Sequence, residues 1–290
     1  MKASVECLGC LVNQAIRLSK IHLDGDDAQL SLLKRIMREI GTSEDTGSTL
    51  ELSCKIHRVL KDALQNPDPY QEEKLYYNSE MLKLENEFFD LVRAADDQLE
   101  TALKLAAAGN IIDFGPGHDL SRETVLRVLN HTLKRGFDQG VFASLKSDLC
   151  KAKKLLYLGD NAGEIVFDKV FISTITTAYP DLQVDFATRG AAILNDVTEE
   201  DAYFVGMDNY AQIINNGTDM PGTVLEHCSS SFKQAFNNAD VIIAKGQGNF
   251  ESLYGSGQGN LYYIFLCKCD LIMERCGLLK NELVLLKEKS

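Results

Sequence analysis

The chain has 290 residues, 45% of them hydrophobic and 25% charged, which is typical of an ordinary globular protein with one large core or two smaller ones. Its 42 Asp and Glu residues outnumber its 30 Lys and Arg residues, for a net charge of −12, and the sequence shows no basic cluster with interleaved aromatics. We therefore expect no nucleic-acid partner, and no membrane partner either, since no apolar run approaches the ~20 residues of a membrane helix.

The first half of the chain carries a helical pattern. From Cys7 to about Phe142, apolar residues recur at every third or fourth position. The segments that show this are LVNQAIRLSKI, SLLKRIMREI, HRVLKDAL, NSEMLKLENEFFDLVRAADDQLETALKLAAAGN and VLRVLNHTLKRGF. Turn-forming residues near Gly25, Gly41, Asn66 and Asp113 separate them. We predict a mainly helical domain over residues 1–145.

From Leu155 onward, strand-like and helix-like segments alternate. The predicted strands are KLLYLGD, QVDFATR, AQIINNG, DVIIAKG and a last one, YYIFLCK. The predicted helices are AGEIVFDKVFISTITTAY, DVTEEDAYFVGM and SSSFKQAFNNA. Strands joined by helices of this length favour right-handed crossovers and a mostly parallel sheet. We predict an α/β fold, with the α/β domain over residues 146–290.

Polar residues follow the predicted strands. In open α/β sheets, ligands bind beyond the carboxyl ends of the strands. The polar groups at those ends are Gly159-Asp160-Asn161, Thr188-Arg189-Gly190, Asn215-Asn216-Gly217-Thr218 and Lys245-Gly246-Gln247-Gly248-Asn249, with Asn195 and Asp196 just beyond the second.

These polar residues also have a purely local interpretation. Asn161 with Glu164 resembles a capping box, and Asp196 suits the start of a helix. Capping alone is a less economical account, however, because Asp160, Asn161 and Asp196 are expected to converge at one sheet edge beside Lys245.

Oxygen ligands of this kind suit a divalent cation. Carboxylate and amide oxygens are preferred by Mg²⁺, Mn²⁺ and similar ions, and the scarcity of histidine argues against a zinc hydrolase. We predict that Asp160, Asn161 and Asp196 hold one divalent ion, Mg²⁺, Mn²⁺, Co²⁺ or Ni²⁺, whose identity the sequence leaves open. Backbone N–H groups at a helix start can hold the anion that such an ion bridges, which favours phosphate ester chemistry.

Several motifs resemble a known family. GDNAGE, TRGAAILNDVT, DVIIAKGQGNFE, GNIIDFG, DPY and the early C-x-x-C are similar to motifs of the damage-control phosphatases, formerly domain of unknown function 89, and of their prokaryotic-type stand-alone branch. The resemblance runs from Cys7 to about Cys269. It implies a helical domain packed on a Rossmann-like three-layer αβα domain, with a divalent metal between them. It also implies a phosphatase of small phosphorylated metabolites, such as sugar phosphates or damaged metabolites.

The resemblance also implies residue roles. Asp160, Asn161 and Asp196 match the metal-binding positions, and Lys245 matches a phosphate-contacting lysine. The residues expected to bind phosphate or substrate are Asn110, Asp113, Gly163, Arg189, Asn195, Lys245, Gly246, Gln247, Gly248 and Asn249. Arg189 has two open interpretations, a clamp on the phosphate or a structural ion pair. Glu251 departs from other branches, where this position is basic, so their substrates are not transferable.

The expected mechanism is direct attack of a metal-activated water on phosphorus. The predicted catalytic residues are Asp160, Asp196 and Lys245, with Lys245 and the backbone N–H groups of residues 246–248 neutralising phosphoryl charge. Asp160 or Asp113 would orient or deprotonate the water. An aspartyl-phosphate on Asp160 is the alternative.

The cysteines leave further alternatives open. With no export signal, the eight cysteines are expected to be reduced in a cytoplasmic protein. Cys7 and Cys10 with Cys267 and Cys269 could form a four-thiolate zinc site, although buried structural thiols are the favoured interpretation. The alternative functions are an S-adenosylmethionine-dependent carboxyl methyltransferase and a non-catalytic metal or thiol protein. The partner is otherwise expected to be a small phosphorylated metabolite, with a homo-oligomer possible.

Overall fold

The computed structural model describes residues 4–43, 48–109, 121–279 and 282–289. Its helices there are α1 (Val5–His22), α2 (Asp26–Thr42), α3 (Thr49–Leu64), α4 (Gln71–Lys83), α5 (Glu85–Arg93), α6 (Gln98–Gly109), α7 (Arg122–Leu133), α8 (Gln139–Lys151), α9 (Glu164–Ala178), α10 (Glu199–Phe204), α11 (Ser230–Asn238), α12 (Gly246–Leu253) and α13 (Asp270–Cys276), with short 3₁₀ helices η1 (Met207–Asn209) and η2 (Leu225–His227). Its strands are β1 (Lys154–Leu158), β2 (Gln183–Thr188), β3 (Gln212–Asn215), β4 (Val241–Lys245), β5 (Leu261–Leu266) and β6 (Leu283–Lys287).

The strands form one sheet with the order β3-β2-β1-β4-β5-β6 within the described ranges. Neighbours from β3 to β5 are parallel, and β6 pairs antiparallel with β5. The predicted α/β fold with a mostly parallel sheet is therefore confirmed. The chain order reverses between β1 and β4, and a crevice opens beyond the carboxyl ends of the strands at such a switch point. This topology fixes where a ligand site is to be sought.

Two elements differ from the sequence-based prediction. YYIFLCK is not the last strand, because LVLLK near the end of the chain forms β6 at the sheet edge. No helix was predicted for the stretch after β4, which forms helix α12. Its two glycines have poor helix propensity, yet Phe250 and Leu253 are buried, and Phe250 packs on Tyr263 and Phe265. Tertiary packing thus overrides local propensity here.

Helices cover both faces of the sheet. Alternate residues of β1 point to opposite faces, so that Tyr157 joins one hydrophobic cluster while Leu156 and Leu158 join another. The first cluster contains side chains of α4 to α9, and the second contains those of α11 to α13. Although α9 is buried along most of its length, neither it nor any other described helix is long and apolar enough to cross a membrane.

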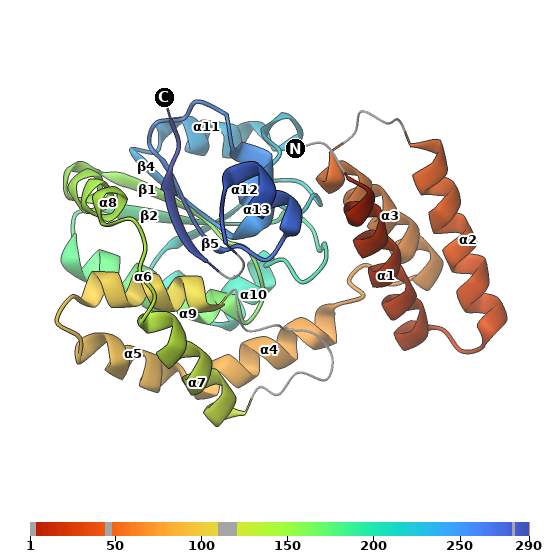
Figure 1. Ribbon diagram of the computed structural model, residues 1–290, viewed down its shortest axis with the longest axis horizontal. Coiled ribbons are helices and arrows are strands. Elements are labelled where there is room, and N and C mark those ends of the chain that lie inside the picture. Colours follow the sequence, from red (N-terminus) through yellow and green to blue (C-terminus); the bar gives the residue numbers. More distant parts are fainter. Residues whose placement is uncertain (1–3, 44–47, 110–120, 280–281, 290) are drawn as a thin grey trace.

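Helices α1 to α3 form a separate small bundle beside this three-layer core (Figure 1). Its cluster includes Leu11, Ile36 and Ile56, whereas the main cluster runs across residue 145, from α6 and α8 into β1. The division at 145/146 stays a prediction, and the hydrophobic clusters set apart α1 to α3 alone. Arg58 on α3 holds this bundle to the α/β part through Asp219, with an Nη2 to Oδ1 distance of 2.6 Å.

Candidate active site

A pocket of about 750 Å³ opens at the switch point of the sheet. Asp160, which follows β1, and Gln247, which follows β4, line it from the α/β part. Leu11 of α1 and Leu50 of α3 line it from the helical bundle. A volume of this size suits a small-molecule ligand. The pocket thus lies between the two parts of the molecule, where the sheet topology predicts a site.

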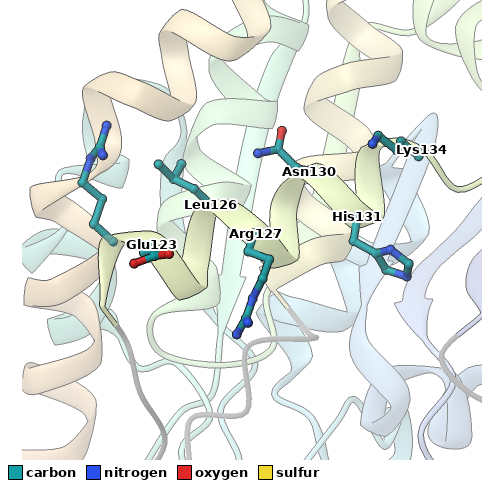
Figure 2. Close-up of a pocket in the computed structure, with 7 residues that line it drawn as sticks. Glu123, Leu126, Arg127, Asn130, His131 and Lys134 are labelled. Atoms are coloured by element: carbon teal, nitrogen blue, oxygen red, sulfur yellow. The ribbon is translucent and has the colours of Figure 1, made fainter.

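A second hollow, of about 640 Å³, lies along α7 (Figure 2). Its lining residues belong to α7 and the position just after it, and include Arg127, His131 and Lys134. None of its lining residues was predicted as a site residue. We therefore take the pocket at the switch point as the candidate site.

Two loops are joined at the floor of this pocket. Asn161 and Asp196 form an antiparallel bridge, and the N–H of Val197 donates to the carbonyl oxygen of Asp160 at 2.9 Å. The N–H of Ala162 donates in turn to the carbonyl oxygen of Asn195, also at 2.9 Å. These bonds bring Asp160, Asn161 and Asp196 together although the loops are over thirty residues apart, as the sheet argument predicts.

None of these three side chains caps a helix. Helix α9 starts after Gly163, which has a φ of 78° and no side chain that could cap the helix. Helix α10 starts after Thr198, whose N–H donates to Asp201 at 2.9 Å. The capping interpretation is therefore wrong for Asn161 and Asp196. Asn161 instead directs Nδ2 to Oδ2 of Asp160 at 2.7 Å.

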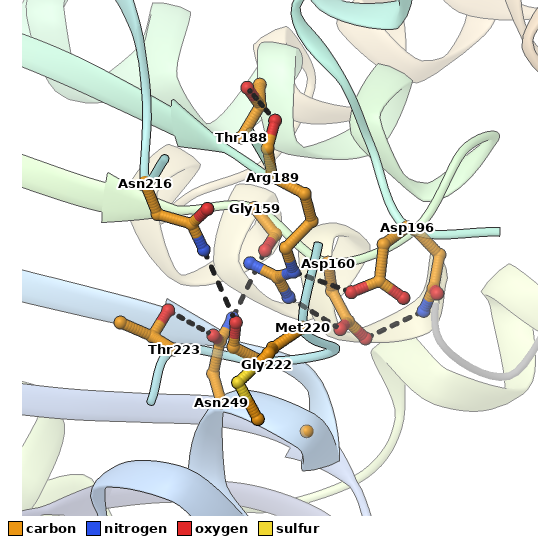
Figure 3. A network of polar contacts seen from close by, with 12 residues as sticks. Gly159, Asp160, Thr188, Arg189, Asp196, Asn216, Met220, Gly222, Thr223 and Asn249 are labelled. Atoms are coloured by element: carbon orange, nitrogen blue, oxygen red, sulfur yellow. Dashed lines mark hydrogen bonds and ion pairs between the residues drawn. The ribbon is translucent and has the colours of Figure 1, made fainter. Parts of the chain in front are cut away.

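Arg189 lies beside both carboxylates (Figure 3). Its Nε donates to Oδ2 of Asp196 at 2.6 Å, and its Nη2 is 3.8 Å from Oδ1 of Asp160. The side chain is 1% exposed, and Nη2 has no hydrogen-bond partner in the part of the chain that the structure describes. The ion-pair interpretation of Arg189 is thus observed, and its contact with a phosphate stays a prediction.

Burial and mutual repulsion disfavour the charged forms of these acids. Burial, then the neighbouring charges of Glu164 and Asp196, hold the pKa of Asp160 well above its usual range, against the opposing effect of Arg189. Burial also raises the pKa of Asp196, although Arg189 counteracts it. Two carboxyl groups in this state gain from an added positive charge, because it stabilises both ionised forms.

The sequence as a whole matches a described family. A family model described as the damage-control phosphatase ARMT1-like domain matches residues 3–284. This chain belongs to the damage-control phosphatase family. The family assignment made from the motifs, and with it the expectation of a phosphatase, is confirmed. The methyltransferase alternative gains no support.

Individual relatives agree with this membership. The chain is 34% identical over 299 residues to an uncharacterised protein of Methanocaldococcus jannaschii, covering 99% of this chain and 96% of that one. It is 32% identical over 300 residues to a damage-control phosphatase of Pyrococcus horikoshii, covering 100% and 99%. A crystal structure of a domain of unknown function 89 protein from P. horikoshii superimposes with a TM-score of 0.89 at 29% identity, over 100% of both chains. The chain therefore has the same fold as this relative.

Lys245, the predicted phosphate contact of the family, has other partners in this structure. Its Nζ donates to Glu164 at 2.6 Å, to Asp168 at 2.5 Å and to the carbonyl oxygen of Ala106 at 2.8 Å. The side chain is fully buried and does not line the pocket. Burial raises the pKa of Asp168 to about 6, with Lys245 opposing the rise. The phosphate contact of Lys245 stays a prediction, and the observed role is to neutralise two buried acids beneath the site.

The other predicted phosphate-binding residues after β4 divide into two groups. Gln247 and Gly248 line the pocket at the start of α12, where helix N–H groups favour an anion. Asn249 does not line it, because its Nδ2 donates to the carbonyl oxygen of Gly159 at 3.1 Å (Figure 3). The same Nδ2 donates to the carbonyl oxygen of Lys245 at 2.7 Å. Asn249 therefore ties the end of β1 to the start of α12.

The remaining predicted site residues do not all line the pocket. Asn195 lines the pocket, whereas the N–H of Gly163 is taken by Oδ1 of Asn78 at 2.6 Å. Asn110 and Asp113 lie outside the described residues. Gly163 thus contacts α4, and it is not among the residues that line the pocket.

Some pocket residues were missed by the motif argument. Glu6 of α1, Lys268 before α13, and Asp270 at the start of α13 line the pocket, as does Glu251 of α12. No sequence pattern links these positions, since only the packing of α1 and α13 brings them together. Glu164 was considered only as a capping residue, yet a charged residue at the start of the apolar segment EIVFDKVF was a signal for a buried ion network.

Replacing Gly246 by alanine is expected to damage the site. A Cβ there would lie 1.8 Å from Oδ2 of Asp160, and the φ of Gly246 is +78°. Gly257→Ala is the matched control, because Gly257 has a φ of +75° and nothing within 4 Å of its Cβ position. We expect Gly257→Ala to cost about 1 kcal/mol of unfolding free energy, and Gly246→Ala roughly 1–3 kcal/mol more. Urea unfolding of both variants measures the difference, and equal losses would show that the close contact with Asp160 is not real.

Proposed function

We propose that this chain is a divalent-metal-dependent phosphatase that hydrolyses small phosphorylated metabolites at the pocket of Asp160, Asn161 and Asp196. The observation that carries the proposal is the convergence of two buried carboxylates and one amide, from two joined loops, at the switch point of the sheet. Family membership supports the phosphatase, and the metal requirement is our proposal.

The donor set fits such an ion. Among the described residues, no group of three or more His, Cys, Asp or Glu side chains is arranged to hold a metal. Asp160 and Asp196 nevertheless offer carboxylate oxygens. Asn161 can offer its amide oxygen as well, because only the neighbouring groups decide which way its side-chain amide is turned. Because burial holds the pKa of both acids above their usual range, an ion of charge +2 suits this place. When bound, the ion would supply Lewis acidity and lower the pKa of a water.

The residues of the chain supply charge neutralisation around the phosphoryl group. Arg189 presents a buried guanidinium whose Nη2 has no hydrogen-bond partner in the described ranges. The first turn of α12, with Gln247 and Gly248, directs helix N–H groups to the pocket. These preorganised donors stabilise the negative charge that develops on phosphoryl oxygens. Arg189 thus acts as phosphate clamp and as partner of Asp196.

The proton of the attacking water needs an acceptor. Asp160 lies at the floor of the pocket, and its pKa is held above the usual range for an aspartic acid by burial and by Glu164 and Asp196. A carboxylate with a raised pKa is a better general base near neutral pH. We propose that Asp160 orients the water and accepts its proton.

The pocket walls suggest the nature of the substrate. Glu6, Glu251 and Asp270 line it, opposed by the cationic side chain of Lys268. Carboxylates bind hydroxyl groups well and repel a second anionic group. We propose that the preferred substrates carry one phosphate on a hydroxyl-rich body, as sugar phosphates do, rather than on a body with further carboxylates or phosphates.

Removal and return of metal tests the proposed function. Metal-stripped protein is expected to hydrolyse p-nitrophenyl phosphate at background rate, and Mg²⁺, Mn²⁺, Co²⁺ or Ni²⁺ is expected to restore turnover, because the ion completes the charge balance at Asp160 and Asp196. Phosphate release is measured for each ion, with a sugar monophosphate and a sugar bisphosphate as alternative substrates. Full activity in the stripped protein would refute the metal requirement.

Two other expectations stay predictions. A cytoplasmic location and a homo-oligomer were predicted from the sequence, and light scattering coupled to size exclusion measures the second directly.

A further inference from the structure

The pocket wall contains sulfur as well as oxygen. Among the described residues, the cysteines that line the pocket are Cys7 and Cys10 of α1, and Cys269 just before α13. We propose that Cys7 and Cys10 are an oxidisable dithiol, a modification site in the wall of the pocket, and that they close to a disulfide on two-electron oxidation. The assignment of this site does not depend on the phosphatase chemistry, and only its effect on turnover rests on the proposed function.

The helix places the two sulfurs on one face. Residues three apart in a helix have Cβ atoms about 5–6 Å apart, whereas a disulfide needs about 3.5–4.5 Å. Closing that gap takes a small tightening of the first turns of α1. Helix α1 starts at Val5, and its preceding residue Ser4 makes no capping bond to a helix N–H, so this end is not locked by a cap. Cys10 is exposed and Cys7 is partly exposed, which gives an oxidant access to both.

The surroundings of Cys7 favour reaction there. Its Sγ is 3.4 Å from Oγ of Ser4. Burial tends to raise the pKa of the Cys7 thiol, but hydrogen bonds from Ser4 and Thr49 outweigh this and lower the pKa below its usual value. The thiolate is the reactive form of cysteine, so Cys7 is the nucleophile of the pair.

Cys10 suits the complementary role. Burial, followed by the negative charge of Cys7 and then of Cys269, raises the pKa of the Cys10 thiol. Cys7, Cys10 and Cys269 all line the same pocket. A protonated neighbour is what a sulfenic acid on Cys7 needs, because the condensation releases water.

Three of the other thiols differ from this pair. Burial raises the pKa of Cys54, Cys228 and Cys267 to about 11, so these side chains are inert. Cys267 is fully buried while Cys269 lines the pocket, and no metal-holding group of three is found in the described part of the chain. The four-thiolate zinc site suggested by the spacing is therefore not assembled, which leaves the dithiol as the use of Cys7 and Cys10.

The reaction balances with hydrogen peroxide as the oxidant. The Cys7 thiolate attacks one peroxide oxygen, the O–O bond breaks, and with one proton the products are a sulfenic acid on Cys7 and one water. The Cys10 sulfur then attacks the Cys7 sulfur, an S–S bond forms, and the second water leaves with the thiol proton. A dithiol reductant reverses the change.

Oxidation is expected to act on substrate binding. The sulfurs lie in the wall that α1 contributes, whereas Asp160 and Asp196 lie on the loops of the α/β part. A tightened first turn of α1 reshapes that wall and moves Glu6 within it. We expect KM to rise about threefold or more on oxidation, with kcat changed by less than about twofold.

The test is peptide mass spectrometry of protein treated with hydrogen peroxide. Trypsin releases residues 3–17 as one peptide that contains both Cys7 and Cys10, so their disulfide removes two hydrogens from that single peptide. Cys150, which is exposed and lies in another peptide, is the internal control. The expected result is the disulfide peptide at peroxide levels that leave Cys150 reduced, reversed by dithiothreitol.

Four serine variants separate the possible outcomes. Cys7→Ser and Cys10→Ser are expected to abolish the two-hydrogen loss, while Cys269→Ser and Cys150→Ser retain it, with circular dichroism confirming the fold of each variant. A cross-link between residues 3–17 and the peptide starting at Cys269 would overturn the pairing. Oxidation of Cys150 at the same peroxide level, or no disulfide at all, would overturn the site. Since the readout is a mass, a failure of metal-dependent turnover has no bearing on it.

Discussion

Asp160→Asn is expected to abolish metal-supported phosphate release while the folded protein survives with equal or greater stability. The loss in kcat/KM is expected to be on the order of 10³-fold, the usual scale for one preorganised charge-stabilising group. The stability expectation follows from burial and from repulsion by Glu164 and Asp196, which already disfavour the Asp160 carboxylate. A neutral isostere removes that repulsion and keeps an oxygen that can accept from Nδ2 of Asn161.

The stability difference has a predicted pH dependence. The pKa of Asp160 is raised in the folded protein. The contribution of protonated Asp160 to the free energy of unfolding is therefore fully present below the ordinary pKa of about 3.8, and it is lost as the pH rises through the raised value. In metal-free solution, the melting temperature of Asp160→Asn should therefore exceed that of the wild type by a margin that grows as the pH rises above about 3.8 toward the raised pKa. Added metal should reverse the order, because only the wild type binds it tightly.

Asp201→Asn is the matched control. Asp201 is also buried, but it lies outside the pocket and accepts from Nζ of Lys74 at 2.9 Å and from Nδ2 of Asn78 at 3.0 Å. Loss of this charge is expected to lower the melting temperature while turnover below that temperature persists. Differential scanning calorimetry and phosphate release measure both variants. Retained activity in Asp160→Asn, or equal destabilisation of the two, would contradict the proposed role of Asp160.

The sequence predicts those parts of the fold that depend on the spacing of its hydrophobic residues. The alternation after Leu155 gave the parallel strands, and the strand-end rule then gathered Asp160, Asn161 and Asp196 from separate loops. Helix α12 was missed because its two glycines have poor helix propensity, while the burial of Phe250 and Leu253 stabilises it. A pattern within a short stretch of sequence does not show which side chains tertiary packing will bury.

The direction of side chains was less predictable than their clustering. Lys245 and Gln247 are two residues apart, yet Gln247 lines the pocket and Lys245 points into the core, toward α9. The deciding contacts, Glu164 and Asp168, lie about eighty residues earlier in the chain. A motif therefore locates a strand end, while the burial of neighbouring charges decides which side chain faces the ligand.

Lys245→Met is expected to destabilise the protein strongly. Lys245 is fully buried, and its Nζ lies between the carboxylates of Glu164 and Asp168. Removing the cation leaves these two acids buried without it, which costs about 3–5 kcal/mol in comparable cases. Urea unfolding of the variant measures the loss. A change below about 1 kcal/mol, within the range typical of exposed pairs, would show that the buried triad is not formed.

The same variant separates a positioning role of Lys245 from a phosphate contact. In the triple variant Lys245→Met, Glu164→Gln, Asp168→Asn, every charge of the triad is removed, so most of the stability is expected to return. If Nζ never reaches the substrate, KM for a sugar monophosphate should then stay within a few-fold of the wild-type value. If Lys245 contacts the phosphate during turnover, the loss of a charge-assisted hydrogen bond should raise KM on the order of 10- to 100-fold even in the restabilised protein. The observed ion pairs favour the first outcome, because breaking them would leave two buried carboxylates without this cation each time a phosphate binds.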